Sequence, residues 1–245
     1  MLAYHNKKEI KEYYLARVRA HRAADELVQG YGYWEGGKGC AVGCTIHGRD
    51  YGAYETELGI PRALARVEDY LFEHLPVEQA RGWPERFLAA INPGADLSLV
   101  GSRWLLWLLS DVEHGTLRLC DPKGAEVTKR IIALYQRKIS GGKISVGGCW
   151  GVRRDAAAAA ANAAAADANA AADAAAAAAA YAAADAAADA NAAYAADAAD
   201  AADAYAAAAA AAKRRGLTPP ELLAIRVPYW EAAARCLERM CQVTS

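Results

Sequence analysis

Residues 98–109 read Ser-Leu-Val-Gly-Ser-Arg-Trp-Leu-Leu-Trp-Leu-Leu and form the densest apolar run in the chain. Ser98 can cap a helix, and the leucines and tryptophans after it recur at helical spacing. A helix that is apolar on most sides is buried in a protein core. The run is too short to cross a bilayer, which takes about 20 apolar residues. It therefore predicts a core helix, and Trp83, Trp104 and Trp107 are predicted core residues.

Helical signals continue on both sides of this run. Leading prolines predict helices over 61–74 and 84–91, and apolar residues at helical spacing predict a helix over 125–138. Nearer the N-terminus, Asn6 followed by Glu9 is typical of a helix start, and this helix should run to about Gln29 and stop at Gly30.

Extended segments are scarce. Only residues 40–46 and 143–146 have a pattern that allows a short strand. Thr218-Pro-Pro-Glu221 has the form of a capping box and predicts a last helix that ends near Cys241. The predicted fold class is all-α, a helical domain with glycine-rich loops plus a long Ala-rich helix or helical hairpin.

Residues 155–212 form an alanine block of only four residue types: 44 Ala, 8 Asp, 3 Asn and 3 Tyr. Alanine has the highest helix propensity, and Lys213-Arg-Arg-Gly216 supplies cations and a glycine stop. A single helix of this length would measure about 87 Å, so the block must project or fold into a hairpin. Alanine faces let helices approach closely, which favours a homo-oligomer; a solvated spacer is the alternative.

The net charge of −1 hides an uneven distribution. The alanine block carries a charge of −8, which leaves an excess of seven positive charges on the other 187 residues. That excess is too sparse for a dedicated nucleic-acid binder. The N-terminus lacks a signal-peptide pattern, and Asp residues interrupt every long alanine stretch. We expect a cytoplasmic protein without a membrane partner, whose six cysteines are reduced or bind metal.

Composition divides the chain into three predicted segments. Residues 1–150 form a helical domain with a glycine, aromatic and cysteine loop, and residues 151–215 form the Ala/Asp-rich helical segment. Residues 216–245 form a C-terminal helix that is expected to pack on the rest.

The loop from Gly30 to Gly39 has a composition suited to a ligand. Its aromatic rings can stack on a base, and glycine-rich backbone with a lysine can hold a phosphate. The pattern is not that of a P-loop. The predicted ligand-binding residues, in this loop and just after it, are Tyr33, Trp34, Lys38, His47, Arg49 and Glu55. In the structural alternative, the side chains of Tyr33 and Trp34 pack into the core beneath the loop.

The segment Cys40-Ala-Val-Gly-Cys44-Thr-Ile-His47 brings two thiols and an imidazole together in sequence. They could bind zinc, with a fourth ligand from His5, His21, Cys120 or Cys149, although structural zinc sites usually take two ligands from each of two segments. Alternatively, Cys40 could be a nucleophile with His47 as its base and Glu55 beside them. The simplest interpretation is that small buried thiols pack against the first helix, so we expect no cofactor, with zinc as the alternative.

The chain also resembles a group of uncharacterised phage and bacterial proteins over about residues 30–215. The resemblance rests on Tyr33-Trp34-Glu35, on residues 37–47 (Gly-Lys-Gly-Cys-Ala-Val-Gly-Cys-Thr-Ile-His), on parts of residues 54–76 and on Trp83-Pro-Glu-Arg-Phe87. Members end in alanine-rich repeats. The resemblance implies no activity, but it implies a phage or mobile-element source, a location in the host cytoplasm and a role in countering host defence.

Three functional hypotheses follow. The first is a non-enzymatic phage-type binding protein that sequesters a nucleotide-like signal or binds a host protein. The second is a Cys/His-dependent enzyme or zinc protein that uses Cys40, Cys44 and His47. The third is a structural protein that oligomerises through its Ala-rich helices.

Overall fold

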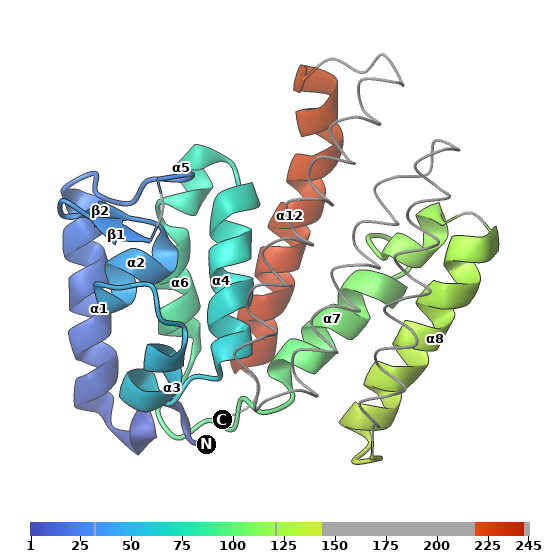
Figure 1. Cartoon of the computed structure of the whole chain (residues 1–245), viewed down its shortest axis with the longest axis horizontal. Helices are drawn as coiled ribbons and strands as arrows, with labels where there is room; N and C mark the ends of the chain where they lie inside the picture. Colours follow the sequence, from blue (N-terminus) through green and yellow to red (C-terminus); the bar gives the residue numbers. More distant parts are fainter. Residues whose placement is uncertain (32, 121, 144–218, 243–245) are drawn as a thin grey trace. The chain divides into compact units, whose positions relative to one another are not determined.

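The computed structural model describes residues 1–31, 33–120, 122–143 and 219–242 (Figure 1). The chain divides into two compact units, one formed by Met1–Trp104 with Arg226–Ser245 and the other by Leu105–Ile225. The division passes through two helices, α7 (Val100–Ser110) and α12 (Pro219–Gln242). Each unit therefore contains a part of both helices.

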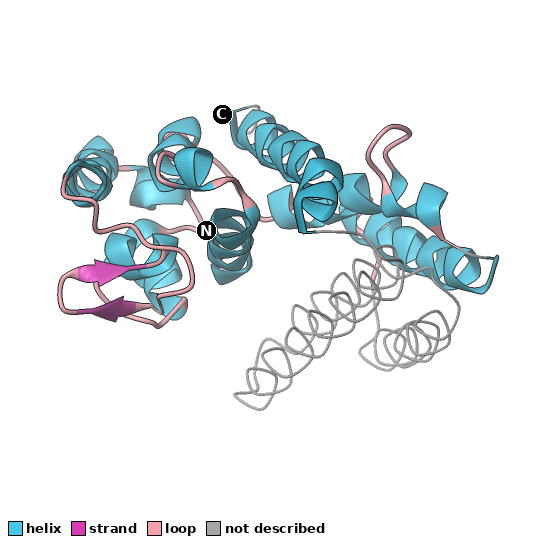
Figure 2. Cartoon of the chain, turned by 90° about the horizontal axis from the view of Figure 1, so that it is seen from above, coloured by secondary structure: helices cyan, strands magenta, loops and turns pink. Residues whose placement is uncertain are grey.

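The first unit consists of short helices and one small hairpin. Its elements in chain order are η1 (Ala3–Asn6), α1 (Lys8–Ala23), β1 (Trp34–Glu35), β2 (Lys38–Gly39), α2 (Ala41–Ile46), α3 (Gly52–Leu58), α4 (Arg62–His74), α5 (Val77–Ala80) and α6 (Trp83–Ala90). Strands β1 and β2 pair antiparallel, and Figure 2 shows them at one edge of the helices.

Helix α4 is at the centre of this unit because it contacts α2, α3, α5 and α6. Its buried face includes Leu64, Val67, Leu71 and Phe72. Burying one such side chain contributes roughly 1.5–3 kcal/mol relative to leaving it exposed. This apolar face therefore holds the surrounding short helices together.

The C-terminal half of α12 belongs to the same unit. The indole N–H of Trp104 donates to the carbonyl of Ala233 at 2.9 Å, and both residues are buried. Nearby, Arg86 on α6 forms an ion pair with Glu238 at 2.9 Å. These contacts join the end of the chain to the helices that follow α4.

The second unit contains the end of α7, the short helix η2 (Thr116–Leu119) and α8 (Pro122–Ile139). Ile131, Ile132 and Tyr135 are buried on α8. The Nδ1–H of His114 donates to the carboxylate of Asp111 at 3.2 Å, and the ring of His114 stacks on Trp107 with ring centres 5.6 Å apart.

The prediction of an all-α fold is confirmed, since the described residues are mostly helical and their only sheet is the two-residue hairpin. The predicted helices at 61–74, 84–91, 98–109 and 125–138 are present as α4, α6, α7 and α8, with ends shifted by up to three residues. Trp83 and Trp104 are buried as predicted, whereas Trp107 is only half-buried.

The prediction of a helix from Asn6 to Gln29 is wrong at both ends. Asn6 has a φ of 58°, so Lys7 takes the N-cap position of α1 without a side-chain cap. At the other end the helix stops at Ala23. Asp25 has a φ of 53°, and the N–H of Glu26 donates to the carbonyl of His21 at 3.0 Å. This is a Schellman motif with aspartate in the position that glycine usually takes.

The prediction of an extended segment at 40–46 is also wrong. Residues Ala41–Ile46 form α2, whose N-cap is Cys40 with its sulfur accepting the N–H of Gly43 at 3.5 Å. The apolar residues of this segment match a strand and a short buried helix equally well, and sequence periodicity alone cannot distinguish the two.

The alanine block (155–212), Thr218 and most of residues 143–146 lie outside the described residues, and so do the predictions that rest on them. Within the part of the chain that the structure describes, no helix is long and apolar enough to span a membrane.

Candidate functional site

Four polar or aromatic side chains meet where the hairpin crosses the ends of α1 and α2: His21, Glu26, Trp34 and His47. His21 Nδ1 lies 2.6 Å from a carboxylate oxygen of Glu26, and His21 Nε2 lies 2.8 Å from His47 Nε2. The ring of Trp34 stacks on His47 with centres 4.3 Å apart and an interplanar angle of 14°. We call these four residues the imidazole cluster.

The Schellman motif at the end of α1 brings Glu26 to His21. By reversing the chain at Asp25, it returns Glu26 towards the last turn of the helix, where His21 lies. If α1 continued as a straight helix, residue 26 would lie on the next turn, away from His21. An uncharged residue at position 26 would not supply the negative charge that a donating imidazole prefers. The local backbone therefore creates the carboxylate–imidazole pair.

The end of α2 presents His47. His47 is the C-cap residue, with φ 53° and ψ 45°, which is the left-handed region. Residues other than glycine adopt it at a cost of roughly 1–2 kcal/mol, and histidine is among the few that do so with some frequency. The backbone turn directs the side chain towards the hairpin instead of along the helix.

The Nδ1–H of His21 donates to Glu26, because a carboxylate only accepts. A neutral His21 accepts at Nε2 from the Nε2–H of His47, whereas a protonated His21 donates its Nε2–H to His47. Burial, the charge of Arg17 and the neighbouring His21 lower the pKa of His47 below its ordinary value, which favours the neutral form of His47.

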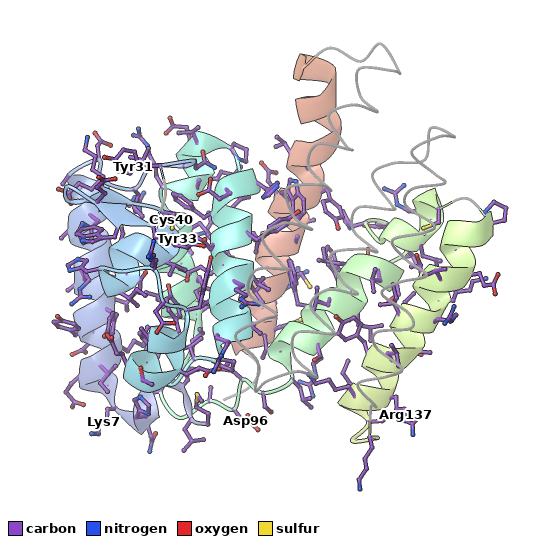
Figure 3. All side chains as sticks on the ribbon, in the orientation of Figure 1. Lys7, Tyr31, Tyr33, Cys40, Asp96 and Arg137 are labelled. Carbon is purple, nitrogen blue, oxygen red and sulfur yellow. The ribbon has the colours of Figure 1, made fainter. Side chains whose placement is uncertain are left out.

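Two of the other predicted ligand-binding residues, Tyr33 and Lys38, lie on or beside the hairpin. Tyr33 is 38% exposed and meets the ring of Tyr51 edge-on at 5.8 Å. Lys38 is exposed on β2 and pairs in register with Glu35 on β1. Figure 3 shows Tyr31 and Tyr33 close to the hairpin end of the unit, together with Cys40. Arg49 is also exposed.

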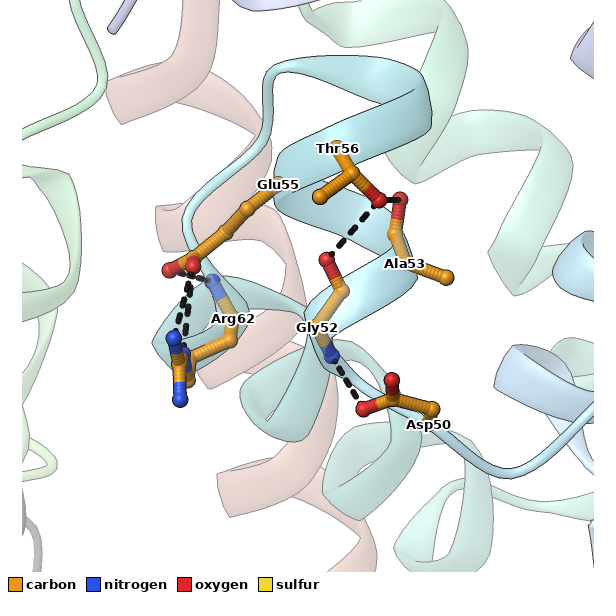
Figure 4. A network of polar contacts seen from close by, with 6 residues as sticks. All are labelled: Asp50, Gly52, Ala53, Glu55, Thr56 and Arg62. Carbon is orange, nitrogen blue, oxygen red and sulfur yellow. Dashed lines mark hydrogen bonds and ion pairs between the residues drawn. The ribbon is translucent and has the colours of Figure 1, made fainter. Parts of the chain in front are cut away.

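Glu55 is held in a different network (Figure 4). Its carboxylate accepts hydrogen bonds from the backbone N–H and the guanidinium of Arg62, at 3.1 Å and 3.0 Å. Burial would raise the pKa of Glu55, but these bonds and the charge of Arg62 outweigh it and lower the pKa. Glu55 therefore joins α3 to α4, and its partner is Arg62 rather than His47 or Cys40.

Cys40 and Cys44 are buried among groups that keep them protonated. Burial and the nearby Asp69 raise the pKa of the Cys40 thiol, and burial raises the pKa of Cys44 to about 12. Cys44 donates to the carbonyls of Glu26 and Gly39, both at 3.5 Å. These partners are those of structural thiols, since a nucleophile or a metal ligand must be a thiolate.

The residues considered as a fourth zinc ligand have separate partners. His5 contacts the carbonyl of Thr56 at 3.1 Å, and Cys120 lies 3.5 Å from the hydroxyl of Thr128. His21 is the member of the imidazole cluster described above, and Cys149 lies outside the described residues. Among the described residues no set of three or more His, Cys, Asp or Glu side chains is arranged to hold a metal ion.

An acidic pair on α4 was not predicted from the sequence. Glu68 is buried and Asp69 beside it is half-buried. Tyr54 donates to Glu68 at 2.5 Å and Tyr51 donates to Asp69 at 2.8 Å. Burial raises the pKa of both carboxyls. The signal was present in the sequence: Glu68 lies four residues after Leu64 and three before Leu71, on the apolar face of the helix.

The sequence matches no protein-family model and no curated protein, and the fold matches no solved structure.

Proposed function

We propose that the chain is a non-enzymatic binding protein whose ligand contacts the β1–β2 hairpin and the adjoining end of α2. The observation that supports this is the gathering of exposed aromatic rings around a fixed polar cluster. Tyr31 and Tyr33 are 46% and 38% exposed. Trp34 and His47 form a preassembled stack beside them.

The chemistry of this surface suits a planar, anionic ligand such as a nucleotide-like signal. Aromatic rings stack on bases with little regard to sequence, at roughly 1–3 kcal/mol for each base. Lys38 on β2 and Arg49, two residues after His47, are exposed cations that can attract phosphate. The Trp34–His47 stack needs no ordering when the ligand arrives, which lowers the entropic cost of binding.

The resemblance to phage and bacterial proteins suggests that this binding would act against a host defence system. Sequestering a nucleotide signal of a host defence system would need affinity and no turnover. The neutral thiols of Cys40 and Cys44 agree with a role that needs no nucleophile. Binding a host protein through the same exposed tyrosines is the other form of this proposal.

Calorimetry of the full chain against cyclic nucleotides and ADP-ribose derivatives tests the proposal. We expect heat with at least one of them and a loss of at least tenfold in affinity in Tyr33→Leu and in Lys38→Gln. Tyr13→Leu is the control, because Tyr13 is another exposed tyrosine and lies on α1, outside the hairpin. The absence of heat with every nucleotide would remove the nucleotide form. Equal weakening by Tyr13→Leu would move the site away from the hairpin.

A further inference from the structure

We propose that His21 and His47 form a binding site for one divalent late transition-metal ion, with the two Nε2 atoms as its protein ligands. The two proposals share His47, but the argument for the metal site does not rest on the nucleotide proposal. It rests on how the two imidazoles face each other and on the carboxylate behind one of them.

The spacing of the two rings is close to that of a metal-bound pair. Two imidazoles on one tetrahedral ion, with metal–nitrogen bonds of about 2.0–2.1 Å, have nitrogens about 3.3–3.4 Å apart and ring centres roughly 5.2 Å apart. Here the nitrogens are 2.8 Å apart and the ring centres 5.0 Å apart. Admitting an ion needs a widening of about half an ångström between the nitrogens together with a tilt of the rings. His47 can make this movement because it is exposed.

Glu26 supplies the support that metal-binding histidines usually have. It accepts the Nδ1–H of His21 at 2.6 Å, so in the neutral ring the lone pair is on Nε2, the nitrogen that faces His47. Such a carboxylate fixes the tautomer and the ring plane and makes the nitrogen a better ligand. The ring of Trp34, stacked on His47, helps to hold the plane of the second imidazole.

The ligand set selects the class of ion. Imidazole nitrogen favours Cu²⁺, Ni²⁺ and Zn²⁺ over Mg²⁺ and Ca²⁺, which prefer oxygen. With two protein ligands, water or an oxygen of a bound molecule completes the coordination. Arg17 donates to the carbonyl of Thr45 at 2.9 Å and its charge reaches His47, so it opposes a cation there. Replacing Arg17 with Gln should therefore strengthen ion binding.

The test is calorimetric titration of the tag-free full chain with Ni²⁺ and with Zn²⁺, without nucleotide. We expect one ion for each chain, no heat with Mg²⁺, and a loss of at least tenfold in affinity in His21→Gln and in His47→Ala. Glu26→Gln should weaken binding by about 10- to 100-fold, as outer-shell changes usually do. Arg17→Gln should tighten it several-fold. Circular dichroism confirms that each variant is folded.

His114→Gln is the matched control, because His114 is also paired with a carboxylate but lies in the other unit. Binding that survives in His47→Ala, or that falls equally in His114→Gln, would overturn the proposal. The absorption spectrum of the Co²⁺-loaded chain gives a second readout. A thiolate-to-cobalt charge-transfer band would assign the ion to cysteine and would also overturn it, whereas nitrogen and oxygen ligands give no such band.

Nucleotide titrations run in the presence of a chelator keep the two proposals separate. Nucleotide binding without metal binding would contradict only the metal site. Metal binding without nucleotide binding would contradict only the nucleotide form of the proposed function.

Discussion

A β-carbon placed on Gly43 would overlap the carbonyl oxygen of Tyr33. The hairpin therefore rests on α2 at a point where only glycine leaves room for its backbone. This close approach carries Trp34 over His47 and so assembles the imidazole cluster.

We expect Gly43→Ala to displace the hairpin from α2. The added methyl group meets backbone, which cannot rotate away, so the free energy of unfolding should fall by about 2 kcal/mol or more. Urea denaturation measures the loss. Gly48→Ala is the control, because its β-carbon would have nothing closer than 3.9 Å, and it should change stability by less than about 0.5 kcal/mol. Equal stability of the two variants would contradict the close approach.

The left-handed backbone of His47 gives a second prediction. His47→Gly relieves the strain at φ 53° but removes the stack on Trp34, so its stability should stay within about 1 kcal/mol of the unaltered chain. His47→Val removes the same contacts and cannot adopt the conformation easily, so it should be less stable than the glycine variant by roughly 1–2 kcal/mol. Thermal unfolding of the His47→Gly and His47→Val variants measures this difference in stability. A valine variant as stable as the glycine variant would show that the turn is not strained.

The helices were predictable because their signals are local. The apolar spacing of α4, α7 and α8 and the proline at the start of α4 and near the start of α6 are properties of neighbouring residues. The end of α1 was not predictable in the same way. Residue 25 has a positive φ, which a glycine there would have indicated, but it is an aspartate. Residues 41–46 form a helix that the backbone of Tyr33 approaches closely at Gly43, and neighbouring residues give no sign of this contact across ten residues.

The candidate site was predictable only in part. Trp34, Lys38 and His47 were placed in one region by their nearness in sequence, but His21 and Glu26 belong to the preceding helix and loop. The pairing of His21 with His47 spans 26 residues and depends on the Schellman motif and the hairpin together. Conversely, Cys40, Cys44 and His47 are neighbours in sequence, yet the backbone gives the thiols and the imidazole different partners.

The buried carboxyl of Glu68 should make stability depend on pH. Burial raises its pKa, the hydrogen bond from Tyr54 lowers it in part, and the neighbouring Asp69 raises it again, so the fold favours the neutral acid. An acid whose pKa is higher folded than unfolded contributes stability that is complete below its unfolded pKa of about 4.3, and this is lost as pH rises. The loss is up to about 1.4 kcal/mol for each pH unit until the folded pKa is reached.

Denaturation of Glu68→Gln at pH 5 and pH 8 isolates this effect. The free energy of unfolding of the unaltered chain, measured relative to the variant, should be higher at pH 5 than at pH 8. Glu12→Gln serves as the control, since Glu12 is exposed in a surface pair with Lys8, and it should leave the pH dependence unchanged. A difference between chain and Glu68 variant that is constant with pH would mean that the carboxyl is ionised in the fold.

The thiols of Cys40 and Cys44 should react slowly in the folded chain. The pKa of Cys44 is raised to about 12 and that of Cys40 is raised too, so at pH 8 nearly all of both thiols are protonated, and both side chains are buried. Alkylation requires the thiolate. Peptide mapping by mass spectrometry after brief exposure to iodoacetamide should find Cys120, which is half-buried, modified well before either of them. In urea the three should react at similar rates, because unfolding removes both the burial and the pKa shift. Fast modification of Cys40 in the folded chain would instead favour the Cys/His enzyme.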